Sequence, residues 1–487
     1  MTTAITAASD LKAQYDLIVI GAGPAGMSAA TEAASHGVSV LLLDENASPG
    51  GQIYRAVTRT PVSDRSVLGD DYWKGEKIAE DFLVSSADYA AGATVWSLGN
   101  AEAHTPENPL HEIGLSLDGV ARIIAGKQVI IATGALERPF PIPGWTLPGV
   151  MTGGGAQTVL KSSGLVPDGK TVLAGCGPLL YLFAAQVIAA GGKISALLDT
   201  TPSANWSKAL PHLPAFLASP YLKKGLKLLW KVRRNIRVVR GVTDIKAEGE
   251  GKLSSVTFTK GGRSETLPAD LLLLHQGVAP NINLSNAAGC AQDWDEVQLC
   301  FVPRTNEWFE SSVPGVVIAG DGAGIAGAES AALRGKLAAI GAVFRLGRLD
   351  AARRDNAAAN VRIDLEIMGR GRAFLDTLYQ PAKAFRVPQA AETLVCRCEE
   401  VTAGMIRQAV SDGVTGPNQM KSFLRCGMGP CQSRQCGLTL TEMIADERGL
   451  PPAQIGGLRL RPPVKPVTLA ELAALPKTEA AIKAVVR

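Results

Sequence analysis

Clustered cysteines give this chain its clearest chemical signal. Five of the eight cysteines lie between Cys396 and Cys436, in the strings CRC and RCGMGPCQSRQC. Thiolate sulfur is a soft ligand, and four thiolates satisfy either zinc or an iron–sulfur cluster. Structural zinc sites usually use cysteine pairs separated by about two to four residues. The CxC of Cys396 and Cys398 therefore favours an iron–sulfur cluster and leaves zinc as the alternative.

Five cysteines compete for four ligand positions in such a centre. Cys426 and Cys431 enclose four residues, and Cys431 and Cys436 enclose four as well, so spacing alone does not choose among them. A helix is expected directly after the CxC string, from Ala403 onward, with Thr402 as its N-cap. The two cysteine groups are thus expected on either side of this helix.

A second chemical signal lies near the start of the chain. Residues 15–44 contain an apolar strand, the turn GAGPAG, a helix of small residues and a second apolar strand that ends in an acid. This order is typical of dinucleotide binding, since the glycines allow the tight turn, the approach of a pyrophosphate and close helix packing. The free N–H groups of the helix then face the phosphates, and the acid accepts the ribose hydroxyls. The predicted contacts in this unit are Gly21, Gly23, Pro24, Ala25, Gly26, Asp44 and Glu45.

The same plan occurs again at residues 170–199, which indicates an internal duplication of the nucleotide fold. Here the third glycine position holds Leu180, which we expect to crowd the approach of a pyrophosphate. None of Cys176, Cys290 and Cys300 belongs to a CxxC that could pass on a nicotinamide's electrons. Three interpretations stay open: a scaffold without a redox role, which we favour, a bound adenine nucleotide without hydride transfer, and a working NAD(P) site.

Composition limits what the elements around these motifs can be. A chain of 487 residues with 52 glycines and 46% hydrophobic residues predicts about three α/β-type units. A net charge of +4 does not indicate nucleic-acid binding. No apolar run reaches the about 20 residues that cross a bilayer, and the first residues lack the features of a secretory signal. We therefore expect a cytoplasmic protein, in which clustered cysteines are ligands or redox groups.

Two further features are ambiguous in the sequence. The stretch 201–240 is rich in Lys, Arg and Trp, which is typical of a membrane surface, an acidic partner or, most often, the solvated face of a helix. We favour the solvated face and leave a peripheral membrane association open. His275 stands alone in the apolar string LLLLHQ, where a packed histidine is expected more often than one that approaches a cofactor.

Three further strings distinguish FAD from NAD in the first unit. With them the chain resembles the two-dinucleotide-domain flavoprotein superfamily, in which these stretches jointly bind FAD. The resemblance implies that Asp321 bonds the ribityl and pyrophosphate region and that the helix after it points its N-terminus at the flavin ring. The strings are SPGGQIYR with Gly51 and Gln52, IIATGALERP with Ala132, Thr133 and Gly134, and AGDGAG with Gly320 and Asp321.

CRCEEVT and GMGPCQSRQC together resemble the [2Fe-2S] module first known in bacterioferritin-associated ferredoxin. That module is also appended to flavoproteins such as anaerobic glycerol-3-phosphate dehydrogenase. Related modules retain the cysteines that match Cys431 and Cys436 and often carry another residue at the position of Cys426. The resemblance implies that Cys426 is spare and that the ligands are Cys396, Cys398, Cys431 and Cys436.

Nearly end to end, the chain resembles the FAD-binding subunits of bacterial opine oxidases, hydrogen cyanide synthase, and heteromeric proline, hydroxyproline and sarcosine dehydrogenases. GGQIYR, GCGPLL, AGDGAG and CRCEEVT carry this resemblance. In that family a partner flavoprotein similar to amino-acid oxidases oxidises the C–N bond of the amine. The resemblance implies such a partner, an FMN of the kind that sarcosine oxidase relatives hold between subunits, and a small ferredoxin-like third subunit.

The function implied by this resemblance is electron transfer from the partner's flavin to an external acceptor. A flavin accepts electron pairs and a cluster relays single electrons, so the combination suits this role. Two alternatives stay open. One is a self-sufficient NAD(P)H-dependent FAD/[2Fe-2S] reductase, and the other is a protein whose cluster is a redox sensor or a structural staple.

The resemblance also implies a domain plan. The predicted fold class is α/β, with two Rossmann-like dinucleotide-binding domains and a small helical [2Fe-2S] module. The predicted divisions are 14–150 with 270–347 for the FAD-binding domain, 151–269 for the second nucleotide fold, 348–390 for a linker, 391–450 for the [2Fe-2S] module and 451–487 for a tail.

Overall fold

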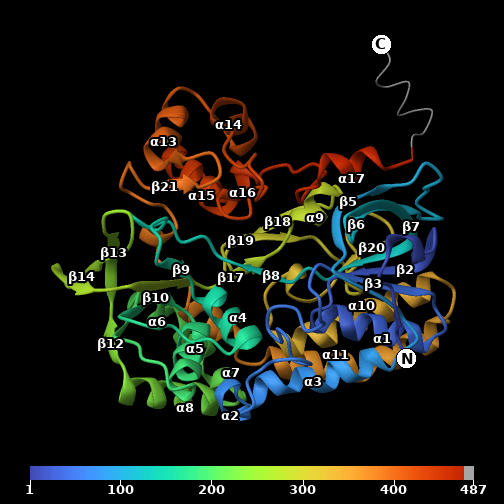
Figure 1. The fold of residues 1–487 in the computed structure, drawn as a ribbon, viewed down its shortest axis with the longest axis horizontal. Coiled ribbons are helices and arrows are strands. Elements are labelled where there is room, and N and C mark those ends of the chain that lie inside the picture. Colours follow the sequence, from blue (N-terminus) through green and yellow to red (C-terminus); the bar gives the residue numbers. More distant parts are fainter. Residues whose placement is uncertain (477–487) are drawn as a thin grey trace.

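The N-terminal unit is built on an eight-stranded sheet, seen on the right in Figure 1. The computed structural model describes residues 1–476. The strands next to β2 are parallel to it, as expected for apolar strands joined by helices. In spatial order the strands are β1 (Thr3–Ala4), β4 (Asp88–Ala91), β3 (Val40–Asp44), β2 (Gln14–Ile20), β7 (Val120–Ile131), β6 (His111–Leu117) and β5 (Thr94–Asn100), with β20 (Val316–Ile318) also on β7.

Helices α1 (Pro24–Ser35) and α10 (Ala328–Arg345) pack against each other beneath this sheet (Figure 1). Their closeness depends on small residues, since a Cβ on Gly335 would lie 2.0 Å from the carbonyl oxygen of Ala25. Their alanines share a core with strand residues such as Leu17. Further helices at this unit are α2 (Arg65–Leu68), α3 (Asp70–Leu83), α9 (Asn283–Ala287) and α11 (Ala351–Gly369).

The middle unit repeats the parallel arrangement with five strands. Helices α4 (Gly153–Ser163), α5 (Pro178–Ala189) and α8 (Tyr221–Asn235) belong to it, with the short helices α6 (Ala204–Ala209) and α7 (Leu213–Leu217) before α8. In order the strands are β12 (Arg237–Arg240), β11 (Ala196–Asp199), β10 (Thr171–Cys176), β16 (Leu271–Gln276) and β9 (Val150–Thr152). A separate antiparallel sheet holds β13 (Val242–Glu248), β14 (Ser255–Lys260) and β15 (Arg263–Pro268).

The chain crosses twice between the two units. The crossing segments β8 (Ala135–Glu137) and β17 (Val278–Pro280) pair antiparallel. Just beyond them, β16 pairs with β10 along its whole length, so residues 271–276 lie in the middle sheet although the sequence division groups them with the first unit. An apolar strand that is buried on both faces carries no sign of which parallel sheet it will join.

The cysteine-rich part forms a compact module at the top of Figure 1. The Thr402 hydroxyl accepts a hydrogen bond from the Met405 amide at 3.3 Å, which confirms the predicted N-cap. Residues 477–487 of the predicted tail lie outside the described part. Most of the predicted linker 348–390 is helical, since α11 and α12 (Arg372–Leu378) lie within it. The elements after it are β21 (Leu394–Cys396), β22 (Val401–Thr402), α13 (Ala403–Ser411), α14 (Pro417–Leu424), α15 (Gly437–Arg448), α16 (Pro452–Ile455) and α17 (Leu469–Ala473). Within residues 1–476, no helix has the length and apolar character to span a bilayer.

Candidate functional site

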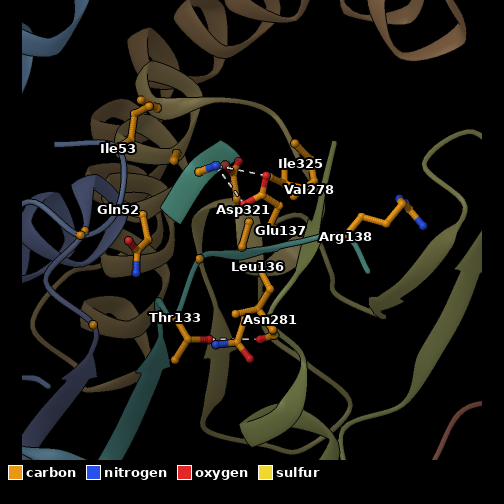
Figure 2. Close-up of a pocket in the computed structure, with 18 of the residues that line it drawn as sticks. Gln52, Ile53, Thr133, Leu136, Glu137, Arg138, Val278, Asn281, Asp321 and Ile325 are labelled. Carbon is orange, nitrogen blue, oxygen red and sulfur yellow. Dashed lines mark hydrogen bonds between the residues drawn. The ribbon is translucent and has the colours of Figure 1, made fainter. Parts of the chain in front are cut away.

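A cavity of about 640 Å³ opens at the carboxyl ends of the first sheet's parallel strands. It is lined by every predicted cofactor residue except Gly26 and Gly320. Gln52, Thr133 and Asp321 come from three separate segments around it (Figure 2). Residues far apart in the sequence therefore share one cavity.

Gly26 and Gly320 do not line the cavity but pack against residues that do. A Cβ on Gly26 would lie 1.7 Å from the carbonyl oxygen of Gly21, and a Cβ on Gly320 would lie 2.6 Å from the Cβ of Ala25. Gly320 also has a φ of 69°. Both positions need glycine so that α1 can approach the strand ends and the loop before α10.

Asp44 ends β3 and lines the cavity. Its Oδ2 accepts a hydrogen bond from the Ala22 amide at 2.5 Å, and its Oδ1 accepts from the amide and side chain of Asn46 at 2.7 Å. Burial raises the pKa of this carboxyl above its ordinary value. Next to it, Glu45 pairs with Lys465 at 2.6 Å, so the C-terminal tail borders this end of the cavity.

Asp321 fixes the loop that leads into α10. Its Oδ1 accepts hydrogen bonds from the amides of Ala326 at 2.8 Å and Gly327 at 3.1 Å. Gly327 and Ala328 line the cavity, so the N-terminus of α10 lies at its wall. On the other side, the Thr133 hydroxyl donates to the carbonyl of Asn281 at 3.1 Å (Figure 2).

These surroundings fit an FAD. A Cβ on Gly51, whose φ is 60°, would lie 2.8 Å from the Cα of Gly23, so glycines leave an open backbone cradle at the first turn. The N-termini of α1 and α10 both border the cavity and offer N–H groups to phosphates. Acids at Asp44 and Asp321 complete a donor and acceptor set suited to a dinucleotide.

Glu137 and His275 are cavity residues whose pairing the sequence did not reveal. His275 is buried, as expected, but its Nδ1 lies 2.6 Å from Oε1 of Glu137 and both residues line the cavity. The two oxygens of Glu137 also accept from the Gly154 amide at 3.1 and 3.0 Å. The only sequence signal for Glu137 was its position three residues after the ATG string.

Lys161 joins the two nucleotide folds from within the core. Its Nζ donates to the carbonyls of Gln52 at 3.2 Å and Ile53 at 2.9 Å, and to Oε1 of Gln157 at 3.0 Å. Burial lowers the pKa of Lys161 to about 7. Helix α4 of the middle unit thus holds the FAD-fold loop that carries Gln52. A lysine among helical residues gave no sign of this role.

The second nucleotide fold has its terminal acid engaged by the protein itself. The Tyr181 hydroxyl donates to Oδ2 of Asp199 at 2.6 Å, and the Thr201 amide donates to Oδ1 at 2.9 Å. Asp199 does not line the cavity, whereas Gly177 does. Leu180, which we expected to crowd a pyrophosphate, is buried in the core and does not line the cavity either.

A segment of the linker, Leu378–Gln380, lies against the carboxyl end of the middle sheet and is called the closing segment. The Asn205 side chain donates to the carbonyls of Leu378 at 3.0 Å and Gln380 at 2.9 Å. Cys176, at the end of β10, donates to the Tyr379 carbonyl at 3.5 Å. Ligands of open α/β sheets bind at this edge. The protein's own chain therefore covers part of the second nucleotide cleft.

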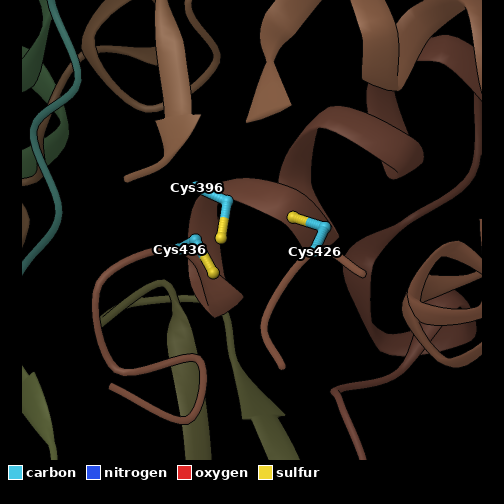
Figure 3. A group of neighbouring side chains, drawn as sticks. All are labelled: Cys396, Cys426 and Cys436. Carbon is cyan, nitrogen blue, oxygen red and sulfur yellow. The ribbon is translucent and has the colours of Figure 1, made fainter. Parts of the chain in front are cut away.

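Three of the clustered thiols form a buried group. The sulfurs of Cys396, Cys426 and Cys436 lie within 4.8 Å of one another (Figure 3). Hydrogen bonds with Cys426 and Cys436 lower the pKa of Cys396 to about 2. The predicted spare residue, Cys426, thus lies beside two predicted ligands.

The other two predicted ligands are also neighbours. Burial raises the pKa of Cys431, and a hydrogen bond with Cys398 raises it further. A Cβ on Gly429 would lie 2.2 Å from the Cβ of Cys398, so the glycine of the GMG string makes room for this cysteine. Four soft thiolates drawn from these five residues fit an iron–sulfur cluster. The choice of four stays a prediction.

The cysteine module borders the FAD cavity. Arg434, from the loop between Cys431 and Cys436, lines the same cavity as the FAD motifs. The Asn283 side chain donates to the carbonyl of Gln432 at 2.7 Å and ties this loop to the first unit. The thiol group and the dinucleotide cavity are thus adjacent parts of one structure.

Comparisons with known proteins agree with this architecture. The family described as pyridine nucleotide-disulphide oxidoreductase matches residues 15–338, and the sarcosine oxidase A3 domain matches residues 390–475. The opine oxidase A subunit of Agrobacterium tumefaciens (strain Ach5) is 50% identical, over 99% of this chain and 96% of its own length. Hydrogen cyanide synthase subunit HcnB of Pseudomonas aeruginosa is 32% identical, over 92% of this chain and 96% of its own.

A solved structure shows the same fold. L-proline dehydrogenase from P. horikoshii superimposes with a TM-score of 0.69, covering 97% of this chain and 80% of that one, at 17% identity. The match at residues 15–338 supports FAD binding, and the named relatives are oxidoreductase subunits. The chain therefore belongs to the family of opine oxidase A subunits and their relatives, oxidoreductases built on the pyridine nucleotide-disulphide oxidoreductase fold.

Proposed function

We propose that this chain is the electron-transfer subunit of a heteromeric, cytoplasmic dehydrogenase that acts on opines or related secondary amines. FAD would supply the exchange between electron pairs and single electrons, and a [2Fe-2S] cluster would supply a one-electron relay. A partner flavoprotein similar to amino-acid oxidases would oxidise the C–N bond. An FMN at the subunit interface and a small ferredoxin-like third subunit are further parts of this proposal.

The observation that supports the proposal is that the cysteine module borders the cavity formed by the FAD motifs. Arg434, which stands between two of the proposed cluster ligands, lines the cavity that the FAD motifs form. Phosphates would be bound by the N–H groups of α1, and the adenosine ribose by Asp44. Cys396, Cys398, Cys431 and Cys436 would hold the cluster.

The middle fold supports this role over that of a self-sufficient NAD(P)H-dependent reductase. Asp199, the acid that a nicotinamide nucleotide's ribose would need, already accepts the Tyr181 hydroxyl. The closing segment lies across the same sheet edge. We propose that this fold is a retained scaffold that binds no NAD(P).

The test of electron transfer compares the purified chain with the chain co-expressed with an amino-acid-oxidase-like subunit. We expect negligible opine oxidation by the isolated chain and robust reduction of an artificial acceptor by the complex. Robust amine oxidation by the isolated chain would overturn the proposal. Removing the cluster should abolish transfer from the partner, whereas unchanged transfer would support a sensor or structural cluster instead.

Anaerobic titration with NADH tests the alternative reductase. The flavin absorbance of the isolated chain should stay unchanged at stoichiometric NADH, because Asp199 is already engaged by Tyr181 and the closing segment covers part of the second nucleotide cleft. Rapid bleaching near one equivalent would establish a working NAD(P) site and favour the self-sufficient reductase.

A matched pair of cysteine variants tests the ligand set. Cys426→Ser should keep the visible and electron paramagnetic resonance spectra of the cluster, whereas Cys431→Ser should lose them. Both variants remove one thiol from the same module, so general damage would affect them alike. Loss of the cluster in Cys426→Ser alone would assign Cys426 as a ligand in place of Cys431.

A further inference from the structure

One stretch of the middle unit carries only positively charged side chains. Residues 200–243 contain no Asp or Glu and carry nine cations: Lys208, Lys223, Lys224, Lys227, Lys231, Arg233, Arg234, Arg237 and Arg240. Among residues 1–476, the acids that form ion pairs with this stretch are Asp71, which pairs with Lys224, and Glu265, which pairs with Arg237 at 2.7 Å. Most of the positive charge is therefore not neutralised by neighbouring carboxylates.

Helix α8 presents apolar side chains on its outer face. Val232, Leu228 and Leu229 pack into the core on the inner face, whereas Leu226 is 60% exposed and Trp230 is 64% exposed. These two residues stand four positions apart and so lie on one stripe of the helix. Lys223, Lys227 and the Arg233–Arg234 pair flank this stripe, and the Arg234 guanidinium lies 5.4 Å from the Trp230 ring centre.

The elements before α8 also have exposed apolar side chains. Trp206 on α6, Leu210 just after it and Leu217 on α7 are each more than half exposed. Helix α7 contacts α8, and both lie at the edge of the molecule away from the cysteine module (Figure 1). This surface is separate from the FAD cavity, since none of its exposed apolar residues lines that cavity.

We propose that the outer face of α8 docks this protein on the surface of an anionic lipid bilayer. A helix with Lys and Arg around Trp and Leu lies in the membrane interface, with its rings at headgroup level and its cations on lipid phosphates. A second copy of the chain does not fit this face, because like charges would oppose each other. The proposal goes beyond the electron-transfer role and does not depend on it.

Vesicle co-sedimentation of the full chain tests this surface. We expect binding to vesicles of phosphatidylcholine with phosphatidylglycerol, no binding to phosphatidylcholine alone, and loss of binding at high salt. Lys223→Glu with Lys227→Glu should weaken partitioning by about tenfold or more, because four charge units change at the surface. Trp230→Ala should weaken it without changing the charge.

A matched charge reversal provides the control. Lys252→Glu with Lys260→Glu, on the exposed β13–β15 hairpins, makes the same change in net charge and should leave binding intact. FAD content and thermal midpoint report that each variant is folded. Equal binding by the two double variants, or no binding by the wild type, would overturn the proposal. Loss of partner-subunit binding in Lys223→Glu with Lys227→Glu, without vesicle binding by the wild type, would assign the face to an acidic protein instead.

Discussion

The two nucleotide folds of this chain have the same order of elements but differ in the surroundings of the acid that ends the second strand. In each, an apolar strand, a glycine turn, a helix and a second strand lead to an acid, Asp44 in the first and Asp199 in the second. Both carboxylates are 7% exposed, so burial does not distinguish them. Asp44 lines the cavity, whereas Asp199 accepts the Tyr181 hydroxyl and lies outside it.

The order of strand, turn and helix therefore fixes where a nucleotide can bind, but not whether the terminal acid is left free to bind it. In the first fold, the close contact runs between helix and strand, where a Cβ on Gly26 would meet the Gly21 carbonyl at 1.7 Å. In the second, the close contact lies at the first glycine of the turn, where a Cβ on Gly175 would meet the His275 carbonyl at 1.6 Å, as a Cβ on Gly21 would meet the Ala132 carbonyl at 2.5 Å in the first fold. Helix α5 therefore needs no glycine at its third turn position, and Leu180 there is buried in the core.

The most severe test transfers the second fold's residue into the first. Gly26→Leu should abolish FAD binding, because its Cβ would strike main chain that no rotamer change can move, and overpacking costs about 1–3 kcal/mol or more. The ratio of flavin to protein absorbance checks this. Gly99→Ala is the control, since a Cβ there meets nothing within 4 Å. Normal FAD content in Gly26→Leu would contradict the packing argument.

A paired substitution of the two acids should separate their roles. Asp44→Asn should weaken FAD binding by about 10- to 100-fold, since a hydrogen bond to a charged group contributes about 1.5–3 kcal/mol. Asp199→Asn should leave the FAD affinity unchanged. Flavin fluorescence titration of the apoprotein measures both, and equal weakening by the two changes would remove the distinction between the folds.

Removing the internal partner of Asp199 should lower stability without opening a nucleotide site. Tyr181→Phe leaves a buried carboxylate oxygen without its donor, which costs about 1–3 kcal/mol. Tyr379→Phe, also near Asp199, should have little effect, because the Tyr379 hydroxyl has no hydrogen-bond partner within residues 1–476. Thermal unfolding compares the two, and NADH binding gained by Tyr181→Phe would show that the bond to Tyr181 is what keeps a nucleotide from Asp199.

The smallest effect concerns the lysine that joins the folds. Burial lowers the pKa of Lys161 from 10.5 to about 7, so the folded state binds fewer protons than the unfolded state between these values. Stability should therefore rise with pH across this window, by about 1 kcal/mol between pH 7 and 8. Lys161→Met should lack this rise, as the difference in thermal midpoints at the two pH values would show. Parallel pH profiles would mean that Lys161 stays charged.

Much of the first site was predictable because its chemistry lies in local strings. GAGPAG, ATG and AGDGAG each require glycine or an acid at a fixed position, and the cavity brings them together. The pairing of Glu137 with His275 joins residues 138 positions apart, and although His275 stood out in its apolar string, nothing local indicated its partner. Lys161 was equally hidden, because its three acceptors come from another segment and from its own helix.

In the cysteine module, too, features set by neighbouring residues were predictable and contacts between distant residues were not. The helix after the CxC string, with Thr402 as its cap, followed from residues in sequence order. Which thiols become neighbours did not, and the structure places Cys426 beside Cys396 and Cys436. Three chain segments converge there, and spacing within one segment cannot fix their relative positions.

The α/β class, the duplicated nucleotide plan, the FAD motifs and a thiol-rich module could all be predicted from the sequence, because each depends on residues close together in the chain. The packing of distant segments places Tyr181 against Asp199, puts the closing segment over part of the second cleft, brings Arg434 to the FAD cavity and leaves Trp230 exposed. These outcomes depend on which distant surfaces pack together. Packing is set by the whole core rather than by any single motif.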